Sequence, residues 1–205
     1  MSIETKNPLG EQPVNRLLSQ FAIPSIISML VGSLYNIVDQ FFIGQRVGEL
    51  GNAATNIAFP LSTSCLALAL LIGIGGSSAF NLAMGSGDDK KAVHLLGNAV
   101  VLLAGSGLFL SIITFLFLKP LLFFFGSPKA VLPFAIEYTK VTAFGFPFLL
   151  LGTGGGHLIR ADGRPRMTMV CNLIGAVINT VLDALFVFGL NLGMTGAALA
   201  TVIGQ

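Results

Sequence analysis

Two aspartates lie inside apolar segments that are long enough to cross a membrane. They are Asp39 and Asp183, and almost every other acidic residue falls near the end of a segment. A carboxylate surrounded by hydrocarbon is costly unless it faces a polar cavity, a partner or an ion. Each aspartate is therefore a candidate functional residue, and together they indicate a site for a small cation.

Each aspartate also belongs to a polar stripe, because residues three and four apart share one face of an α-helix. Such a stripe is expected to face the interior of a helix bundle or a water-filled cavity. An alternative for Ser25, Ser28 and Asn172 is that they only join helices by hydrogen bonds. The first stripe consists of Ser25, Ser28, Gly32, Tyr35 and Asp39, with Asn36 beside it, and the second of Asn172, Gly175, Asn179 and Asp183.

The composition indicates a membrane protein. Hydrophobic residues make up 54% of the chain and charged residues only 10%, and the mean hydropathy is +0.85. These values lie well outside those of soluble domains. The expected partner is thus the lipid bilayer, and a net charge of +2 gives no support for a nucleic-acid partner.

Six apolar segments follow one another, and the first five reach the roughly 20 residues that a membrane-spanning helix needs. The sixth stops at Gln205 after about ten residues, or roughly 15 Å of helix. We therefore predict an all-α polytopic bundle with five complete transmembrane helices and the start of a sixth, in a chain that is a fragment of a longer protein. The expected helices span residues 17–43, 53–84, 93–118, 134–159, 167–188 and 196–205.

Basic residues favour a cytoplasmic N-terminus, because positive charge is enriched in cytoplasmic loops. This orientation places seven basic residues inside and four outside, and we expect a multi-pass protein of the cell membrane. The inner set is Lys6, Arg16, Lys90, Lys91, Arg160, Arg164 and Arg166, and the outer set is Arg46, Lys119, Lys129 and Lys140.

The same orientation predicts that four polar groups meet at one depth. The first and fifth helices run outward, so Asp39 and Asp183 belong to the outer half of the bilayer. The fourth and sixth run inward, which brings Tyr138 and Thr201 to a similar level. Pro24 interrupts the first helix and is a candidate hinge, although ordinary packing irregularity is the alternative.

Five stretches, in this order, resemble the prokaryotic branch of the multidrug and toxic compound extrusion (MATE) family. They are YNIVDQFFIGQ at 35–45, GIGGSSAFNLAMGSG at 73–87, LIRADGRPR at 158–166, NLIGAVINTVLDALFVF at 172–188 and GAALATVIGQ at 196–205. The resemblance implies half of a twelve-helix, two-lobe transporter, with residues 1–205 as its N-terminal lobe and the C-terminal lobe missing. It also implies a cation-coupled antiporter, rather than an enzyme, that exports drugs or other small organic compounds, often cationic.

The resemblance further implies roles for individual residues. The coupling proton or sodium ion would bind Asp39, Asn179, Asp183 and Thr201, and no cofactor besides this ion is expected. Tyr138 would line the same cavity, and Pro24 resembles a first-helix proline that is associated with bending. Gly156 and His157 stand where members often carry asparagines, so no polar role is transferred to them.

The chemistry of these groups leaves the ion open. A sodium ion needs several oxygen ligands, which Asp39, Asn179, Asp183 and Thr201 can supply and which would then form its metal site. A proton site needs a carboxyl group that stays protonated near neutral pH, and burial or a second carboxylate favours this.

Two other functions remain open at this point. A lipid flippase of the same superfamily would share the helix layout, and a large basic cavity would favour it. An intramembrane aspartyl protease also needs two acids, but Val38 precedes Asp39 and Leu182 precedes Asp183, in place of the Tyr-Asp and Gly-x-Gly-Asp of such proteases.

Overall fold

A computed structural model describes residues 13–205, and this part of the chain is entirely helical outside its turns. Five helices are long and apolar enough to cross a membrane, and a shorter apolar helix follows them. The predicted all-α bundle of five complete spans and one short helix is thereby confirmed. Lys6, which was assigned to the inner basic set, lies outside the described residues.

The helices begin up to four residues before the expected apolar segments, because polar first turns extend them. The long helices are α2 (Val14–Arg46), α3 (Glu49–Gly85), α4 (Asp89–Leu116), α6 (Leu132–Ala161) and α7 (Pro165–Asp183). The short α8 covers Gly193–Gly204. Two elements were not anticipated: a short helix α5 (Leu118–Phe124) and a π-helix η1 (Ala184–Gly189) that continues α7.

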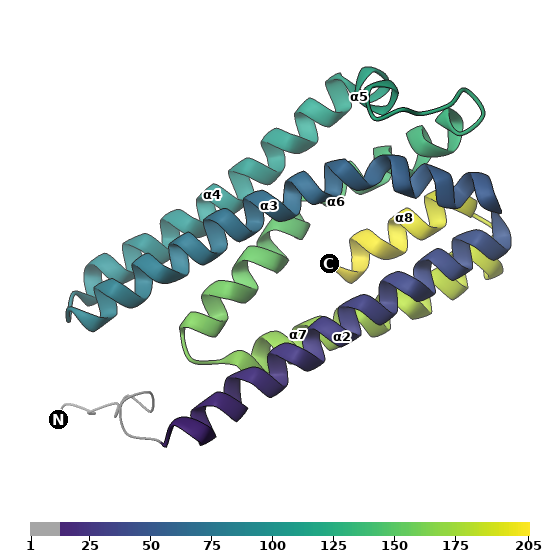
Figure 1. Cartoon of the computed structure of the whole chain (residues 1–205). Coiled ribbons are helices and arrows are strands. Elements are labelled where there is room, and N and C mark those ends of the chain that lie inside the picture. The colour runs from purple at the N-terminus through teal and green to yellow at the C-terminus, as the bar shows by residue number, and fades with distance from the viewer. Residues whose placement is uncertain (1–12) are drawn as a thin grey trace.

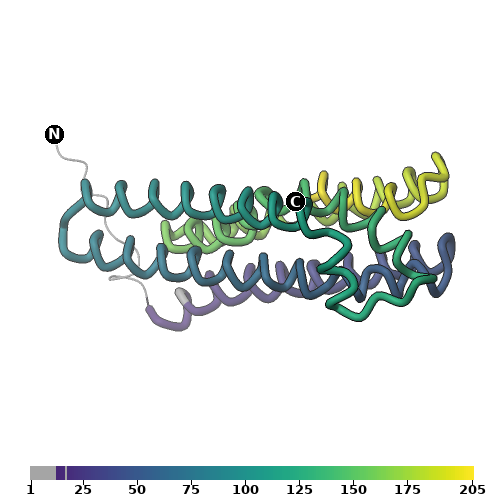
Figure 2. The backbone as a smooth tube through the Cα atoms, turned by 90° about the horizontal axis from the view of Figure 1, so that it is seen from above, coloured from purple at the N-terminus to yellow at the C-terminus, as the bar shows by residue number. Residues whose placement is uncertain are grey.

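The helices form two groups that α8 joins. Helices α3, α4 and α6 pack on one another, whereas α2 packs mainly on α7. Helix α8 lies between the groups and contacts both α6 and α7. Figure 1 shows the α2–α7 pair diverging from the α3–α4 pair, and Figure 2 shows the long helices running along one axis. The path between α2, α6, α7 and α8 is therefore where an interior site can form.

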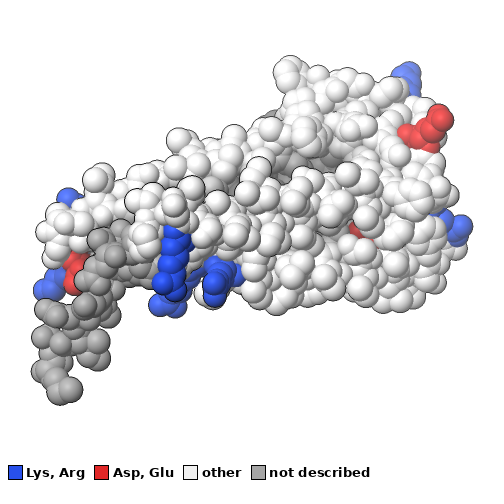
Figure 3. Space-filling view, turned by 60° about the horizontal axis from the view of Figure 1, so that its bottom comes forward, with Lys and Arg blue, Asp and Glu red and all other residues white. Residues whose placement is uncertain are grey.

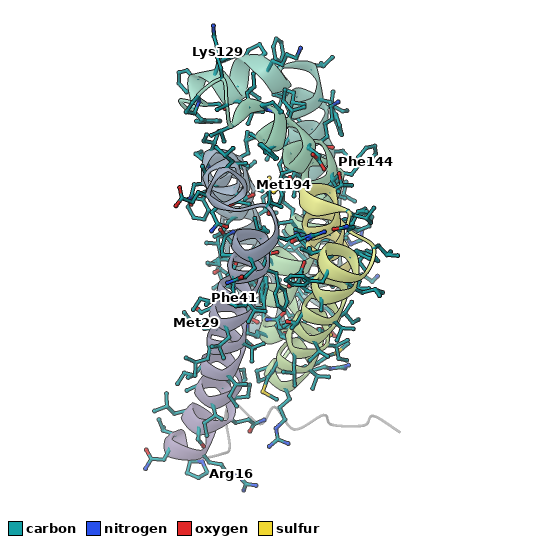
Figure 4. All side chains as sticks on the ribbon, turned by 90° about the vertical axis from the view of Figure 1, so that its right-hand side faces the viewer. Arg16, Met29, Phe41, Lys129, Phe144 and Met194 are labelled. Atoms are coloured by element: carbon teal, nitrogen blue, oxygen red, sulfur yellow. The ribbon has the colours of Figure 1, made fainter. Side chains whose placement is uncertain are left out.

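The molecule has two polar ends separated by an apolar body. Figure 4 shows Arg16 at one end and Lys129 at the other, and we refer to the Arg16 end and the Lys129 end. Figure 3 shows most of the charged atoms toward these ends and a broad uncharged surface between them. Many large apolar side chains are exposed along the helices, including Leu71 on α3, Phe109 on α4 and Phe144 on α6. These features are those of a multi-pass membrane protein.

Polar contacts fix α8 at the Lys129 end. A carboxylate oxygen of Glu137 on α6 accepts hydrogen bonds from the Thr195 backbone N–H at 3.0 Å and from its hydroxyl at 2.6 Å. The carboxylate thus satisfies donors that the first turn of α8 would otherwise leave free. The Arg46 guanidinium at the end of α2 also donates to the Asn191 side chain. These contacts set the position of every α8 residue that reaches the interior.

Glycine permits the closest approach between α4 and α6. A Cβ atom at Gly107 would lie 2.5 Å from the Cα atom of Pro147, closer than real Cβ atoms come to backbone. Gly73 similarly lies against Gly154, where a Cβ atom would come within 2.7 Å of the opposing Cα. Small residues at such crossings let membrane helices pack backbone to backbone.

We predict that Gly107→Leu disrupts the α4–α6 crossing. Overpacking of this kind costs about 1–3 kcal/mol where neighbours can shift, and the backbone of Pro147 cannot shift independently of its helix. Unfolding in detergent micelles, followed by circular dichroism, should show this loss of stability. Gly105→Leu is the matched control, because Gly105 lies on the same helix with no atom near its Cβ position. Equal stabilities of the two variants would contradict the proposed contact.

Candidate cation site and adjoining cavity

The two intramembrane aspartates meet inside the bundle. Asp39 comes from α2 and is 6% exposed, whereas Asp183 is the last residue of α7 and is fully buried. Their side chains lie close enough for the charge of Asp39 to act on Asp183. A hydrogen bond between two carboxyl groups requires that one of them carries a proton, since a carboxylate can only accept. A hydrogen bond between the Asp39 and Asp183 side chains would therefore need a shared proton.

Asn179 connects this pair to α8. With its amide oriented to satisfy both neighbours, the nitrogen donates to Asp183 Oδ2 at 3.2 Å and the oxygen accepts from the Thr201 backbone N–H at 3.2 Å. Asn179 is 2% exposed, so this bridge is shielded from solvent. The close approach of α8 depends on Gly204, where a Cβ atom would lie 2.8 Å from the Asn179 Cβ.

Thr201 and Tyr138 lie beside the acid pair. The Thr201 hydroxyl donates to the Ala197 carbonyl at 3.0 Å, which leaves the hydroxyl oxygen able to accept. The Tyr138 side chain lies next to Thr201 and close enough to both aspartates for their charges to act on it. Residues from α2, α6, α7 and α8 thus converge on one level near the Lys129 end.

Two oxygens of this cluster have no partner. Asp39 Oδ1 and Asp183 Oδ1 are buried without a hydrogen bond in the described part of the chain. Unpaired buried acceptors are costly, so a cation or a second proton would stabilise them. These oxygens fit the hard-ligand chemistry of sodium. No group of three or more His, Cys, Asp or Glu side chains able to hold a metal forms within residues 13–205.

A cavity of about 240 Å³ adjoins the cluster and extends toward the Arg16 end. Asn179 and Thr201 form its wall next to the acid pair, and Tyr35 lines it from α2. The expected cavity residue Asn172 lines it from α7. Its other lining residues are Ser28, Gly32, Phe148, Leu149, Gly152, Thr153, Gly156, Arg160, Thr168, Gly175, Ala176, Gly204 and Gln205.

Asn36 does not line this cavity. Its side chain is exposed, and its amide donates to the Gly32 carbonyl one turn earlier at 2.7 Å. It directly follows Tyr35, and consecutive residues point to different faces of a helix. Tyr138 is also absent from the cavity wall and contacts Thr201 instead. Pro24 is buried within α2, which remains helical on both sides of it.

Arg160 lines the cavity but was assigned from the sequence to the inner charged surface. The sequence contains one indication of this position. Arg160 follows Gly152 and Gly156 at intervals of four residues, which places all three on one face of α6. A glycine one turn before an arginine leaves room for the long side chain to fold back along the helix. Sequence alone does not show whether the side chain uses that room.

The residues after Asp183 wind as a π-helix, the element η1. Such wide turns are rare and frequently occur at functional sites. Here the wide turn starts directly after the aspartate and packs against α8. The π-helix therefore changes the direction of the chain at the level of the acid pair.

Known proteins are similar to this chain both in sequence and in the arrangement of the helices. The sequence pattern of the MatE family matches residues 24–185. The chain belongs to the MatE family. Its members are transporters and not enzymes, which excludes the aspartyl protease interpretation of the two acids.

Individual relatives agree with this membership. Over 204 residues, the chain is 28% identical to a protein of Shewanella oneidensis named FAD transporter, covering 98% of this chain and 45% of the relative. It is 26% identical to the multidrug export protein MepA of Staphylococcus haemolyticus, covering 95% of this chain and 43% of MepA. A crystal structure of a MATE transporter in complex with MaD3S superposes with a TM-score of 0.89 at 27% identity, covering 96% of this chain and 44% of the other. The chain thus spans less than half the length of these relatives.

We predict that the acid pair holds a proton at neutral pH in sodium-free buffer. Infrared difference spectroscopy should detect the carbonyl stretch of a protonated, buried carboxyl group. Asp39→Asn and Asp183→Asn should each remove this band. Asp162→Asn is the control, because Asp162 is an exposed surface residue paired with Arg164 at 3.2 Å. A band that persists in both interior variants would contradict a shared proton.

Proposed function

We propose that the chain is one lobe of a cation-coupled antiporter that exports organic compounds across the cell membrane, with its N-terminus in the cytoplasm. The observation that carries this proposal is the buried pair of Asp39 and Asp183, with unpartnered oxygens beside a cavity. A purely structural bundle would not need two carboxyl groups at this depth. The coupling groups are Asp39, Asn179, Asp183 and Thr201.

The coupling step follows from the charge of the pair. With a proton or a sodium ion bound, one negative charge is neutralised and α2 and α7 can pack closely. When the ion leaves, two carboxylates face each other in a medium of low dielectric constant and repel strongly. Separation of α2 from α7 relieves this repulsion, and Pro24 is the proposed position at which α2 bends. Ion binding thereby biases the bundle between two packings.

The substrate class rests on the relatives and on the cavity. One relative is named for multidrug export and another for FAD transport, and we propose that this chain also handles small organic molecules. Lipid flipping is the second candidate, and the arginine inside the cavity is the observation that favours it. Export of soluble compounds is preferred, because Arg160 is the single basic side chain that residues 13–205 contribute to the cavity wall.

A second lobe is proposed to complete the path. The chain covers 43–45% of the curated relatives, and its cavity is bounded by α2, α6, α7 and α8 alone. Two lobes related by an axis along the membrane normal would place the substrate path between them. The second lobe would supply the wall that faces this cavity.

We predict that Asp39→Asn and Asp183→Asn abolish ion-driven export by the protein expressed from its whole reading frame. Either change removes the charge that the coupling ion compensates, while an amide of the same shape preserves packing. Efflux of a cationic dye from liposomes under an imposed ion gradient is the measurement. Asp162→Asn should export normally, and unchanged export by either interior variant would refute the coupling role.

We also predict that residues 1–205 expressed alone do not transport. The polar stripes of α2 and α7 would then face lipid on their open side, at a cost for each unpaired group. The separated lobe should self-associate in micelles, as measured by light scattering. Ion-coupled dye efflux by a monodisperse monomer of residues 1–205 would overturn the two-lobe proposal.

A further inference from the structure

We propose that the Arg16 end of the cavity binds an oxyanion group, a phosphate or a carboxylate, through the guanidinium of Arg160. This inference rests on the proposed function and specifies its substrate class. It adds anionic and zwitterionic compounds to the cationic ones that the acid pair alone would suggest.

The first observation is where Arg160 lies. It occupies the last turn of α6, where a long basic side chain commonly extends outward to the lipid headgroups. Arg160 instead lines the cavity and is half-buried. A Cβ atom at Gly156 would lie 3.9 Å from Arg160 Nη2, so the side chain folds back along α6 over that glycine.

The second observation is that no described group neutralises Arg160. Within residues 13–205 the one ion pair joins Arg164 to Asp162, on the surface at the same end. No hydrogen bond from the Arg160 guanidinium to another described residue is present either. A guanidinium carries five N–H donors in a planar fork, which matches a carboxylate or a phosphate in two parallel bonds.

The acid pair cannot serve as the counter-charge. Thr168 marks the level of Arg160 on α7, because its hydroxyl donates to the Gly156 carbonyl at 3.2 Å. Asp183 lies fifteen residues further along the α7 sequence, or about 22 Å of helix. The positive and negative groups therefore stand toward opposite ends of one interior path. A mobile anion is left as the partner for Arg160.

The surroundings of Arg160 suit such a ligand. Ser28 and Asn172 line the same cavity, and neither side chain has a hydrogen bond to a described residue. Their hydroxyl and amide groups can donate to the remaining oxygens of a bound oxyanion. Gly152 and Gly156 precede Arg160 on the same face of α6, carry no side chain and leave room beside the guanidinium.

The test compares two fluorescent probes that differ only in one group. They are 4-methylumbelliferyl phosphate and its neutral parent, 4-methylumbelliferone. The protein, expressed from its whole reading frame, is placed in nanodiscs of phosphatidylcholine without an ion gradient, and binding is measured by fluorescence anisotropy. We expect at least about tenfold tighter binding of the phosphate ester, a difference of about 1.4 kcal/mol, because hydrogen bonds between two charged groups are the strong ones.

Variants locate the site. Arg160→Gln should remove the preference for the phosphate ester, and Arg160→Lys should retain part of it, because lysine keeps the charge but lacks the fork. Arg164→Gln is the matched control at the same end and should bind both probes like the wild type. Thermal unfolding of each variant verifies that it is folded. A preference that survives Arg160→Gln, or that is lost in Arg164→Gln, would overturn the proposal.

Two further comparisons complete the test. The first asks whether the bound oxyanion is a lipid headgroup or a soluble compound, and the second distinguishes failure of this proposal from failure of the coupling proposal. Displacement of the phosphate ester when phosphatidylglycerol replaces phosphatidylcholine would identify a lipid headgroup as the ligand at Arg160. Retained binding would identify a soluble compound. The probe assay needs no ion gradient, whereas coupling is tested by dye efflux under an imposed gradient, so the oxyanion site and the ion coupling can each fail separately. Asp162→Asn, on the surface at the same end, should leave probe binding unchanged.

Discussion

The arrangement of this bundle depends on two carboxyl groups that face each other away from water. Within residues 13–205 neither Asp39 nor Asp183 forms an ion pair with a basic side chain, so a proton or another bound cation must offset their charge. The pair draws together α2 and α7, and Asn179 extends the contact to the backbone of α8. In the proposed mechanism, ion occupancy is tied to the packing of these three helices. The contact between the two aspartates would stabilise the close packing when the ion is bound and oppose it when the ion is absent.

Rigid and adjustable parts of the molecule are separated. Glycine contacts lock α3, α4 and α6 at backbone distance, as at Gly107 and Pro147. Helix α2 has few contacts with α3 and depends on α7 for most of its packing. It also contains Pro24, which removes a backbone hydrogen bond from the helix. Asp39, the proposed coupling residue, therefore lies on a helix that has few contacts with the rigid group of α3, α4 and α6.

Residue periodicity predicted the stripes well because it is a property of one helix. Asp39 and Tyr35 share a face, and so do Asn179 and Asp183, and the structure brings both faces to the interior. The prediction that Asn36 lines the cavity fails, because Asn36 directly follows Tyr35 and therefore points to a different face of α2. Periodicity cannot foresee a change in helix type, so η1 after Asp183 was missed. The short α5 was missed because a helix of one or two turns has no measurable period.

The path of a long side chain is also beyond the reach of periodicity. Arg160 ends an apolar helix, and position alone assigns such a residue to the membrane surface. Its actual direction depends on Gly156 beneath it and on Thr168 across the α6–α7 contact. The two proposals together give the interior a cation-binding end and an anion-binding end. A substrate carrying both charges would then compete with the coupling ion at one end only, so its negative group could anchor it while the ion is exchanged.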